Sequence, residues 1–228
     1  MALLGKAAMI LSFGIVPEIL AEHDHWHSFE HLPDRLSIPG FLRGSRWTDP
    51  RNNASYFVMY EVRDLDTLAS PVYLERLNNP TPWTSQMMKH YRGMNRGFCR
   101  VTFSIGVGLG SSGLLFRFSP DAGHEESLRD WLVKEVLPIL PEKPGIVSAH
   151  LFEATLTPEM TKEQRIRGKD CGVDWVALIT GHDERILEKL ATTGQLAPNE
   201  IENHGAINLV SGQYQMRHSL LAQEVCPA

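Results

Sequence analysis

Short apolar runs alternate in the first half of the chain with amphipathic segments and with turns rich in proline and glycine. Short apolar runs bounded by such turns are typical of β-strands, and apolar residues spaced three or four apart are typical of helices. We expect strands at 9–15, 41–47, 55–64 and 97–108. We expect helices at 17–32 and 65–77. The first half therefore predicts the order strand, helix, strand, strand, helix, strand.

The second half repeats this pattern. The run "WHSFEHLPDRLSIPGF", which begins at Trp26, aligns without a gap with "WLVKEVLPILPEKPGI", which begins at Trp131. Six of the sixteen positions are identical and include the tryptophan, two prolines and a glycine. Strands are expected at 114–120, 146–154, 174–183 and 205–216, and a second helix at 183–193. A polar connection at 155–172 is expected to be a loop.

The repeated order predicts an α+β fold made of two ferredoxin-like β-α-β-β-α-β repeats. Each repeat would have helices on one face of its sheet and an open apolar face on the other, which must be buried. Two copies in one chain can bury these faces against each other. We place the boundary in the glycine- and serine-rich stretch 106–113, which gives the domains 1–108 and 113–228.

The run from Trp26 to Phe41, within this repeat, resembles the EthD-like branch of the dimeric α+β barrel superfamily. The resemblance implies a tandem form, with both repeats packed as an intrachain α+β barrel. It also implies a small-molecule protein of catabolism, often acting on aromatic compounds. The superfamily includes cofactor-free oxygenases, isomerases, lyases, dehydratases and haem-handling enzymes, and its members commonly use the cleft between sheet and helices.

Four histidines gather on the helix at 17–32, which we expect to end near Leu32 because Pro33 disfavours a helical residue before it. Helical geometry places His23, His27, Glu30 and His31 on one side. The histidines align with Leu128, Leu132 and Val136 of the second repeat. Replacing an apolar stripe with imidazoles costs hydrophobic burial, so the first repeat is the expected active-site half and the second mainly a scaffold.

Four uses of these histidines remain open. His27 and His31 suit acid–base catalysis at neutral pH, with Glu30 or Asp34 orienting one imidazole. Their spacing of four residues also suits a divalent metal, and one could be an axial ligand of haem. The fourth reading is a histidine-rich helix without a catalytic role. Glu30 matches Glu135 of the second repeat, which favours a structural role for it.

Further candidates lie on the third strand and on the connection at 78–98. Tyr60 is expected to point into the cleft between sheet and helices, where its hydroxyl is a catalytic candidate beside His27, His31, Glu30 and Asp34. Arg92 or Arg96 suits a carboxylate or phenolate. The substrate-binding candidates are His23, Trp26, Trp83, Met87, Tyr91 and Arg92.

Composition narrows the functional class. The formal net charge is −5 and no lysine or arginine run occurs, which argues against nucleic-acid binding. Three widely spaced cysteines argue against a zinc ribbon or a disulfide framework and suit a reducing, cytoplasmic setting. The apolar N-terminal run reads as a strand rather than a signal peptide, and no run reaches the roughly 18 apolar residues of a membrane span.

These observations predict a cofactor-independent enzyme of lyase, isomerase or oxygenase type. Histidine acid–base chemistry would act on an apolar, aromatic or carbonyl-bearing substrate. No cofactor is expected, with haem or a divalent metal at His27 and His31 as the alternative. The alternative function is a non-catalytic small-molecule or haem-binding accessory protein. The expected partner is a small-molecule substrate, without nucleic acid or membrane, and a homodimer is possible.

Overall fold

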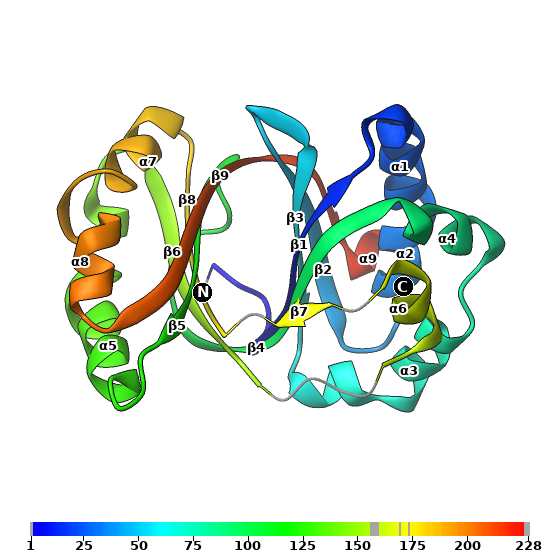
Figure 1. Ribbon diagram of the computed structural model, residues 1–228, viewed down its shortest axis with the longest axis horizontal. Helices are drawn as coiled ribbons and strands as arrows, with labels where there is room; N and C mark the ends of the chain where they lie inside the picture. Colours follow the sequence, from blue (N-terminus) through cyan, green and yellow to red (C-terminus); the bar gives the residue numbers. More distant parts are fainter. Residues whose placement is uncertain (1, 156–159, 169, 173, 226–228) are drawn as a thin grey trace. The chain divides into compact units, whose positions relative to one another are not determined.

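A computed structural model describes residues 2–155, 160–168, 170–172 and 174–225. The chain divides into two compact units (Figure 1). The histidine unit comprises Leu4–Arg100, Thr155–Gly172 and Arg217–Ala228. The second unit comprises Met1–Leu3, Val101–Ala154 and Val173–Met216.

The histidine unit has a mainly antiparallel sheet. Strand β1 (Ala7–Ile15) pairs with β3 (Asn52–Val62) on one side and with β4 (Tyr91–Gly106) on the other. Strand β2 (Phe41–Asp49) pairs with β3. The short β7 (Cys171–Gly172) runs parallel to β4. The four strands predicted for the first half are thus present.

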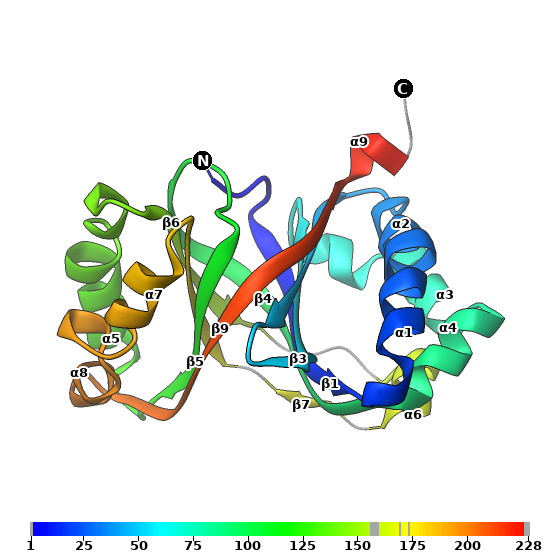
Figure 2. The same cartoon turned by 90° about the horizontal axis from the view of Figure 1, so that it is seen from above.

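Helices cover one face of this sheet, and both views show them on the same side of β1, β3 and β4 (Figures 1 and 2). The segment Leu65–Ala69 is a 3-10 helix, and α3 (Pro71–Asn78) follows it after Ser70, whose side chain caps α3. Thr81 caps α4 (Pro82–Met87) in the same way. A 3-10 turn (Met88–His90) then leads into β4, and α6 (Lys162–Arg167) and α9 (Ala222–Val225) complete the unit.

The histidine-bearing helix is longer than predicted. It begins with a 3-10 turn at Pro17–Ile19 and continues as α1 (Leu20–Trp26), a π-helical turn (His27–His31) and α2 (Leu32–Leu36). The predicted end near Leu32 is therefore wrong. In the π turn the N–H of Leu32 bonds to the carbonyl of His27, five residues back. The extra residue of such a turn relieves the clash between a proline ring and the preceding turn, so the helix passes Pro33.

The second unit has its own antiparallel sheet. Strand β5 (Ser112–Pro120) pairs with β8 (Trp175–Gly181) and β9 (Ala206–Leu221), and β6 (Ile146–Ala154) pairs with β8. Its helices α5 (Glu125–Trp131), α7 (Glu184–Leu190) and α8 (Pro198–Asn203) lie on one face (Figure 2). A π turn (Leu132–Val136) follows α5, and short 3-10 turns occur at Leu140–Glu142 and Gly194–Leu196.

The two sheets have the same internal order. Numbered along the chain, the four main strands of each unit lie in the order 4-1-3-2, with antiparallel neighbours. This is the order of a split βαβ unit, and the fold class is α+β. The compact units do not follow the predicted boundaries 1–108 and 113–228, because β4 and β9 each run from one unit into the other and 155–172 belongs to the histidine unit.

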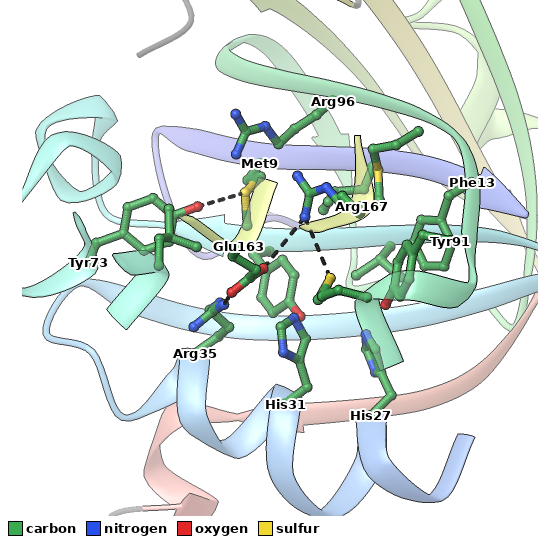
Figure 3. A pocket seen from close by; sticks show the side chains of 16 residues that line it. Met9, Phe13, His27, His31, Arg35, Tyr73, Tyr91, Arg96, Glu163 and Arg167 are labelled. Atoms are coloured by element: carbon green, nitrogen blue, oxygen red, sulfur yellow. Dashed lines mark hydrogen bonds and ion pairs between the residues drawn. The ribbon is translucent and has the colours of Figure 1, made fainter. Parts of the chain in front are cut away.

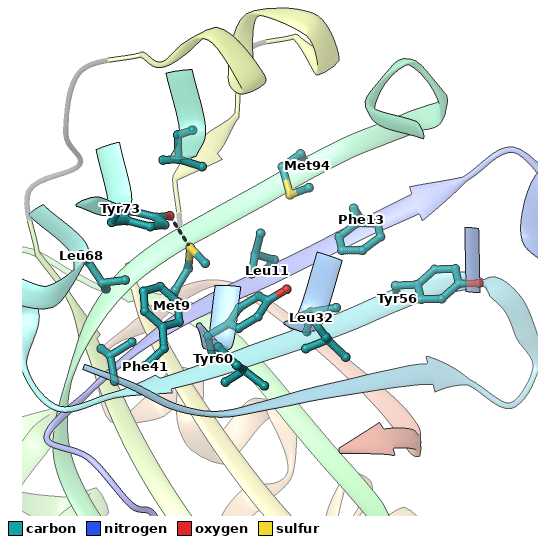
Figure 4. Close-up of a cluster of buried hydrophobic side chains, with 14 of the residues drawn as sticks. Met9, Leu11, Phe13, Leu32, Phe41, Tyr56, Tyr60, Leu68, Tyr73 and Met94 are labelled. Atoms are coloured by element: carbon teal, nitrogen blue, oxygen red, sulfur yellow. Dashed lines mark hydrogen bonds between the residues drawn. The ribbon is translucent and has the colours of Figure 1, made fainter. Parts of the chain in front are cut away.

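The core of the histidine unit lies between its sheet and its helices (Figure 4). Alternate residues of β3 point into it, among them Tyr56, Val58 and Tyr60, as the strand pattern predicts. Gly44 of β2 allows the closest approach of the histidine-bearing helix. A methyl group at Gly44 would lie 2.3 Å from Cδ2 of Leu32 and 3.3 Å from the ring of Tyr60. Among the described residues, no helix is long and apolar enough to cross a membrane.

We predict that Gly44→Ala destabilises the protein by about 1–3 kcal/mol, because the added methyl group overpacks the contact between β2 and the helix. Leu32→Ala alone should also destabilise it, by about 2–5 kcal/mol. The double variant should lose less than the sum of both, since the smaller side chain makes room for the methyl group. Urea unfolding measures all three free energies.

Gly172→Ala is the matched control, because no atom lies within 4 Å of the added methyl group. Strict additivity of the Gly44 and Leu32 substitutions would show that the two positions do not pack against each other.

Candidate active site

A small cavity, lined mostly by buried side chains, lies in the histidine unit between its sheet and its helices (Figure 3). Its volume is about 20 Å³, which is enough for one water molecule. The wall is partly apolar, and its remaining side chains carry rings, hydroxyls and charges. The lining residues are Met9, Leu11, Phe13, His27, His31, Arg35, Val58, Tyr60, Tyr73, Leu77, Met88, Tyr91, Met94, Arg96, Glu163 and Arg167.

His27 and His31 both face this cavity from the π turn of the helix (Figure 3). Their ring centroids lie 5.4 Å apart, and the two side chains are buried. The Nδ1 atoms of both rings are buried and lack a hydrogen-bond partner among the described residues. Buried polar atoms are nearly always paired, so two adjacent exceptions on one cavity wall mark this helix as a functional candidate.

Both imidazoles are neutral at physiological pH. Burial lowers the pKa of His27 well below its ordinary value, and the neighbouring His31 lowers it further. Burial likewise lowers the pKa of His31 well below its ordinary value, and the positive charge of Arg35 adds to this effect. A neutral imidazole accepts a proton, so each ring is in the form that a general base requires.

His23 lies one turn earlier and is also buried. Its Nδ1 lies 3.4 Å from Oδ1 of Asp24, and its Nε2 lies 3.2 Å from the hydroxyl of Tyr91. Asp24 also accepts a hydrogen bond of 2.9 Å from the hydroxyl of Tyr56. The side chain of Asp24 thus lies against both His23 and Tyr56.

Charged side chains form another part of the wall. Arg35 pairs with Glu163, and both are buried. Burial alone would lower the pKa of Arg35, but the negative charges of Glu163 and Asp34 raise it above its ordinary value. Arg167 bonds to Asp170 at 2.8 Å, and Nε of Arg96 lies 3.1 Å from the same carboxylate. Three guanidinium groups and one carboxylate therefore line the cavity itself.

Glu163 and Arg167 come from the connection that was predicted to be a loop. That prediction is wrong for 162–167, which form α6. Thr161 and Gln164 make a capping box at its start, a motif that the sequence carries and that signals a helix. Residues 156–159 and 169 of the connection lie outside the described residues. Arg35 and Glu163 are 128 residues apart, and no local pattern joins them.

Tyr60 lies on the cavity wall, as expected from the alternation of β3. Its hydroxyl is buried and has no hydrogen-bond partner among the described residues. Burial raises its pKa, so the hydroxyl stays protonated and can donate a hydrogen bond. Tyr73 also lines the cavity, and its hydroxyl lies 3.2 Å from the sulfur of Met9.

Two predicted orienting residues have other partners. Glu30 accepts hydrogen bonds from the indole of Trp26 at 3.0 Å and from the hydroxyls of Thr81 and Thr84. These bonds tie the helix to α4, which is a structural arrangement, although the matching Glu135 is exposed. Asp34 pairs with Arg35 and Arg76. Neither carboxylate orients His27 or His31 in this structure.

The predicted substrate-binding residues fall into two groups, those at the cavity and those away from it. Tyr91 lines the cavity, and His23 contacts Tyr91 from behind the wall. The remaining predicted residues lie away from the lining. Trp26 is buried against His31, with ring centroids 4.5 Å apart. Met87 is buried in the core and its neighbour Met88 takes the lining position, while Trp83 and Arg92 lie nearer the surface.

In its present form the cavity has no room for a haem, nor for any other ligand of that size. Pockets for drug-sized ligands have volumes of about 300–1,000 Å³, far above the volume found here. No group of three or more histidine, cysteine, aspartate or glutamate side chains is placed to hold a metal ion within the described part of the chain. We therefore derive no chemistry through either group.

Solved structures share this fold. The chain matches an anthrone oxidase-like protein with a TM-score of 0.71 and 11% identity, over 100% of this chain and 98% of that one. It matches a candidate monooxygenase from Fusobacterium nucleatum with a TM-score of 0.59 and 7% identity, over 94% of each chain. For a candidate monooxygenase from Lactobacillus acidophilus the values are 0.56 and 10%, over 94% and 98%. No protein-family model and no curated protein match the sequence.

We predict that the three buried histidines make stability depend on pH. An unfolded imidazole titrates near pH 6.5, whereas the folded pKa values of His23, His27 and His31 lie lower. Below about pH 6.5 the unfolded chain binds more protons than the folded protein, so acid favours unfolding. Above this pH the contribution of the three neutral imidazoles to the free energy of unfolding is fully present. Together the three rings should contribute a slope of up to about 4 kcal/mol per pH unit.

The test compares urea unfolding between pH 5 and 8. The triple variant His23→Leu, His27→Leu, His31→Val copies the residues of the second repeat and should flatten the slope. His25→Leu removes an exposed histidine from the same helix and should leave the slope unchanged. An equal slope in the wild type and the triple variant would contradict the burial of neutral imidazoles.

Proposed function

We propose that this protein is a cofactor-independent enzyme that removes a proton from a small aromatic or carbonyl-bearing substrate. His27 or His31 is the general base. Oxygenation of the resulting carbanion or enolate by dioxygen is the reaction we favour, since the fold is shared with an anthrone oxidase-like protein and with candidate monooxygenases. Likeness of fold alone does not choose a reaction, so the proposal rests on the site.

One observation carries the proposal. Two neutral imidazoles with unpaired Nδ1 atoms face a water-sized hollow beside the unpaired hydroxyl of Tyr60. A structural histidine would have its ring nitrogens paired, because an unpaired buried polar atom costs about 1–3 kcal/mol. The corresponding positions of the second unit hold Leu128, Leu132 and Val136, which are buried without this cost.

The wall also suits the negative charge that proton removal creates. Arg35, Arg96 and Arg167 line the cavity with Glu163, and their positive charges are shared with the carboxylates of Glu163 and Asp170. Tyr60 can donate a hydrogen bond to a developing oxyanion. Fixed donors and charges in a site without bulk water stabilise such an anion more strongly than water does.

An organic substrate is larger than the present cavity, so one wall must withdraw to admit it. Helix α6 contributes Glu163 and Arg167 to the lining and is held by the ion pair of Glu163 with Arg35. Because both of its lining side chains are charged, its movement exposes ionic groups to water and leaves the apolar wall from β1 in place. We expect α6 to be the wall that moves.

We also propose that the chain is a tandem member of the EthD-like branch of the dimeric α+β barrel superfamily, with both repeats packed as an intrachain barrel. The equal strand order of the units supports a duplication. The π turns at His27–His31 and Leu132–Val136 lie 105 residues apart, and a proline follows each at the same distance.

The enzymatic proposal predicts the effect of removing each base. Dioxygen uptake should be measured with a panel of anthrones, hydroquinones and cyclic diketones. His27→Phe or His31→Phe, whichever removes the base, should lower kcat by about 10²–10⁴-fold. Phenylalanine keeps a ring of similar size on the cavity wall.

His25→Phe is the matched control, because His25 lies on the same helix but is exposed. Undiminished turnover in both the His27 and His31 variants would contradict the assignment. Substrate binding without any turnover in the wild type would favour a binding protein instead.

Cofactor independence gives a separate prediction. Protein purified without added metal should show no Soret or flavin absorbance band, and elemental analysis should find metal far below one equivalent. Turnover should persist in the presence of a strong chelator. A stoichiometric metal or a haem spectrum that is lost in His27→Phe would overturn the cofactor-free mechanism.

A further inference from the structure

Three side chains connect the cavity wall to the protein surface. Tyr91 lines the cavity, and its hydroxyl lies 3.2 Å from Nε2 of His23. Nδ1 of His23 lies 3.4 Å from Oδ1 of Asp24. The side chains of His23 and Asp24 are 0% and 42% exposed, so the row runs from the cavity wall, through a fully buried ring, to a carboxylate that is accessible to solvent.

The direction of the hydrogen bonds follows from the charge of Asp24. Burial would raise the pKa of Asp24, but its hydrogen bond with His23 and the charge of Arg46 lower it below the ordinary value. An ionised carboxylate only accepts hydrogen bonds, so Nδ1 of His23 carries the proton. Nε2 then accepts the hydrogen bond of the Tyr91 hydroxyl, whose pKa burial raises well above the ordinary value.

The hydrogen bonds of this row match those of a hydroxyl, imidazole and carboxylate triad, in which the carboxylate orients the imidazole that accepts the hydroxyl proton. The proposed relay differs from such a triad in one step, because the solvent-exposed Asp24 itself takes up the proton transiently. Asp24 is itself held in place, since the hydroxyl of Tyr56 bonds to Oδ1 and Nη1 of Arg46 bonds to its main-chain oxygen at 2.9 Å. The carboxylate end of the row is therefore held in a defined position.

We propose that Tyr91, His23 and Asp24 form a proton relay that connects the cavity to solvent. This inference rests on the proposed function, because a base that removes a proton from the substrate must pass that proton to water before the next turnover. Tyr91 and His27 both line the cavity, which has room for one bridging water molecule. Tyr91 is thereby assigned as the residue that takes the proton from the site.

The transfer balances without an oxidant or reductant. Protonated His27 gives its proton to the Tyr91 oxygen, directly or through one water molecule. The original hydroxyl proton of Tyr91 passes to Nε2 of His23, and the Nδ1 proton of His23 passes to Asp24, which releases it to water. Only O–H and N–H bonds form and break. The transfer leaves His23 with its proton on Nε2, and the reverse sequence, which returns a proton to the product, restores the starting tautomer.

The relay is tested without a substrate, by the exchange of ring N–H protons with water. Protein labelled with ¹⁵N-histidine reports this exchange for His27 by NMR. Tyr91→Phe keeps the ring but removes the hydroxyl, and it should slow the exchange at His27 tenfold or more. Asp24→Asn should slow it by a similar factor. A merely structural role predicts the opposite, because loosened packing would accelerate exchange.

Tyr73→Phe is the matched control, because Tyr73 is a second buried tyrosine on the cavity wall, with its hydroxyl near Met9 rather than a histidine. It should leave the exchange rate unchanged. Exchange in Tyr91→Phe that equals or exceeds the wild-type rate overturns the relay. If Asp24→Asn does not fold, Tyr91→Phe alone decides. Failure of the proposed enzyme activity would appear in turnover and not in this exchange.

Discussion

The burial of neutral imidazoles on one helix is the constraint on which the site depends. His23, His27 and His31 lie in the core of their unit, where the charged form of each ring is disfavoured. His23 is paired at both nitrogens, whereas His27 and His31 keep unpaired Nδ1 atoms. The hydrogen-bonding groups of the His23 ring are thus used within the fold, whereas His27 and His31 each keep a nitrogen atom without a partner on the wall of the cavity.

The comparison of the two units separates architecture from chemistry. Both units have a π turn followed by proline at corresponding positions, although π turns often accompany functional sites. Because the second unit has the turn without histidines, the turn belongs to the shared architecture. The chemistry lies in the side chains that replace Leu128, Leu132 and Val136, and these replacements occur in the histidine unit alone.

The cavity has an acid–base part and an ionic part. The imidazoles come from the histidine-bearing helix and Tyr60 comes from β3. These two elements are close in sequence, and the periodicity of each directs these side chains toward the cavity. The ionic part is completed by Glu163 and Arg167 on α6. Most of the lining residues thus come from the first hundred residues, and a distant segment adds one carboxylate and one guanidinium group. The ion pair between Arg35 and Glu163 connects the two segments.

The sequence by itself determined the order of the main strands, the internal similarity at Trp26 and Trp131, and the histidine-bearing face, because each follows from local patterns. It also predicted that Tyr60 points toward the helices. It did not predict the helices α4, α6 and α8. Only the tertiary structure decided that Glu30 and Asp34 bind other partners, that Asp24 turns toward His23, and that Met88 rather than Met87 lines the cavity. Such choices depend on which side chains meet across long separations, such as the 128 residues between Arg35 and Glu163, and no local pattern encodes them.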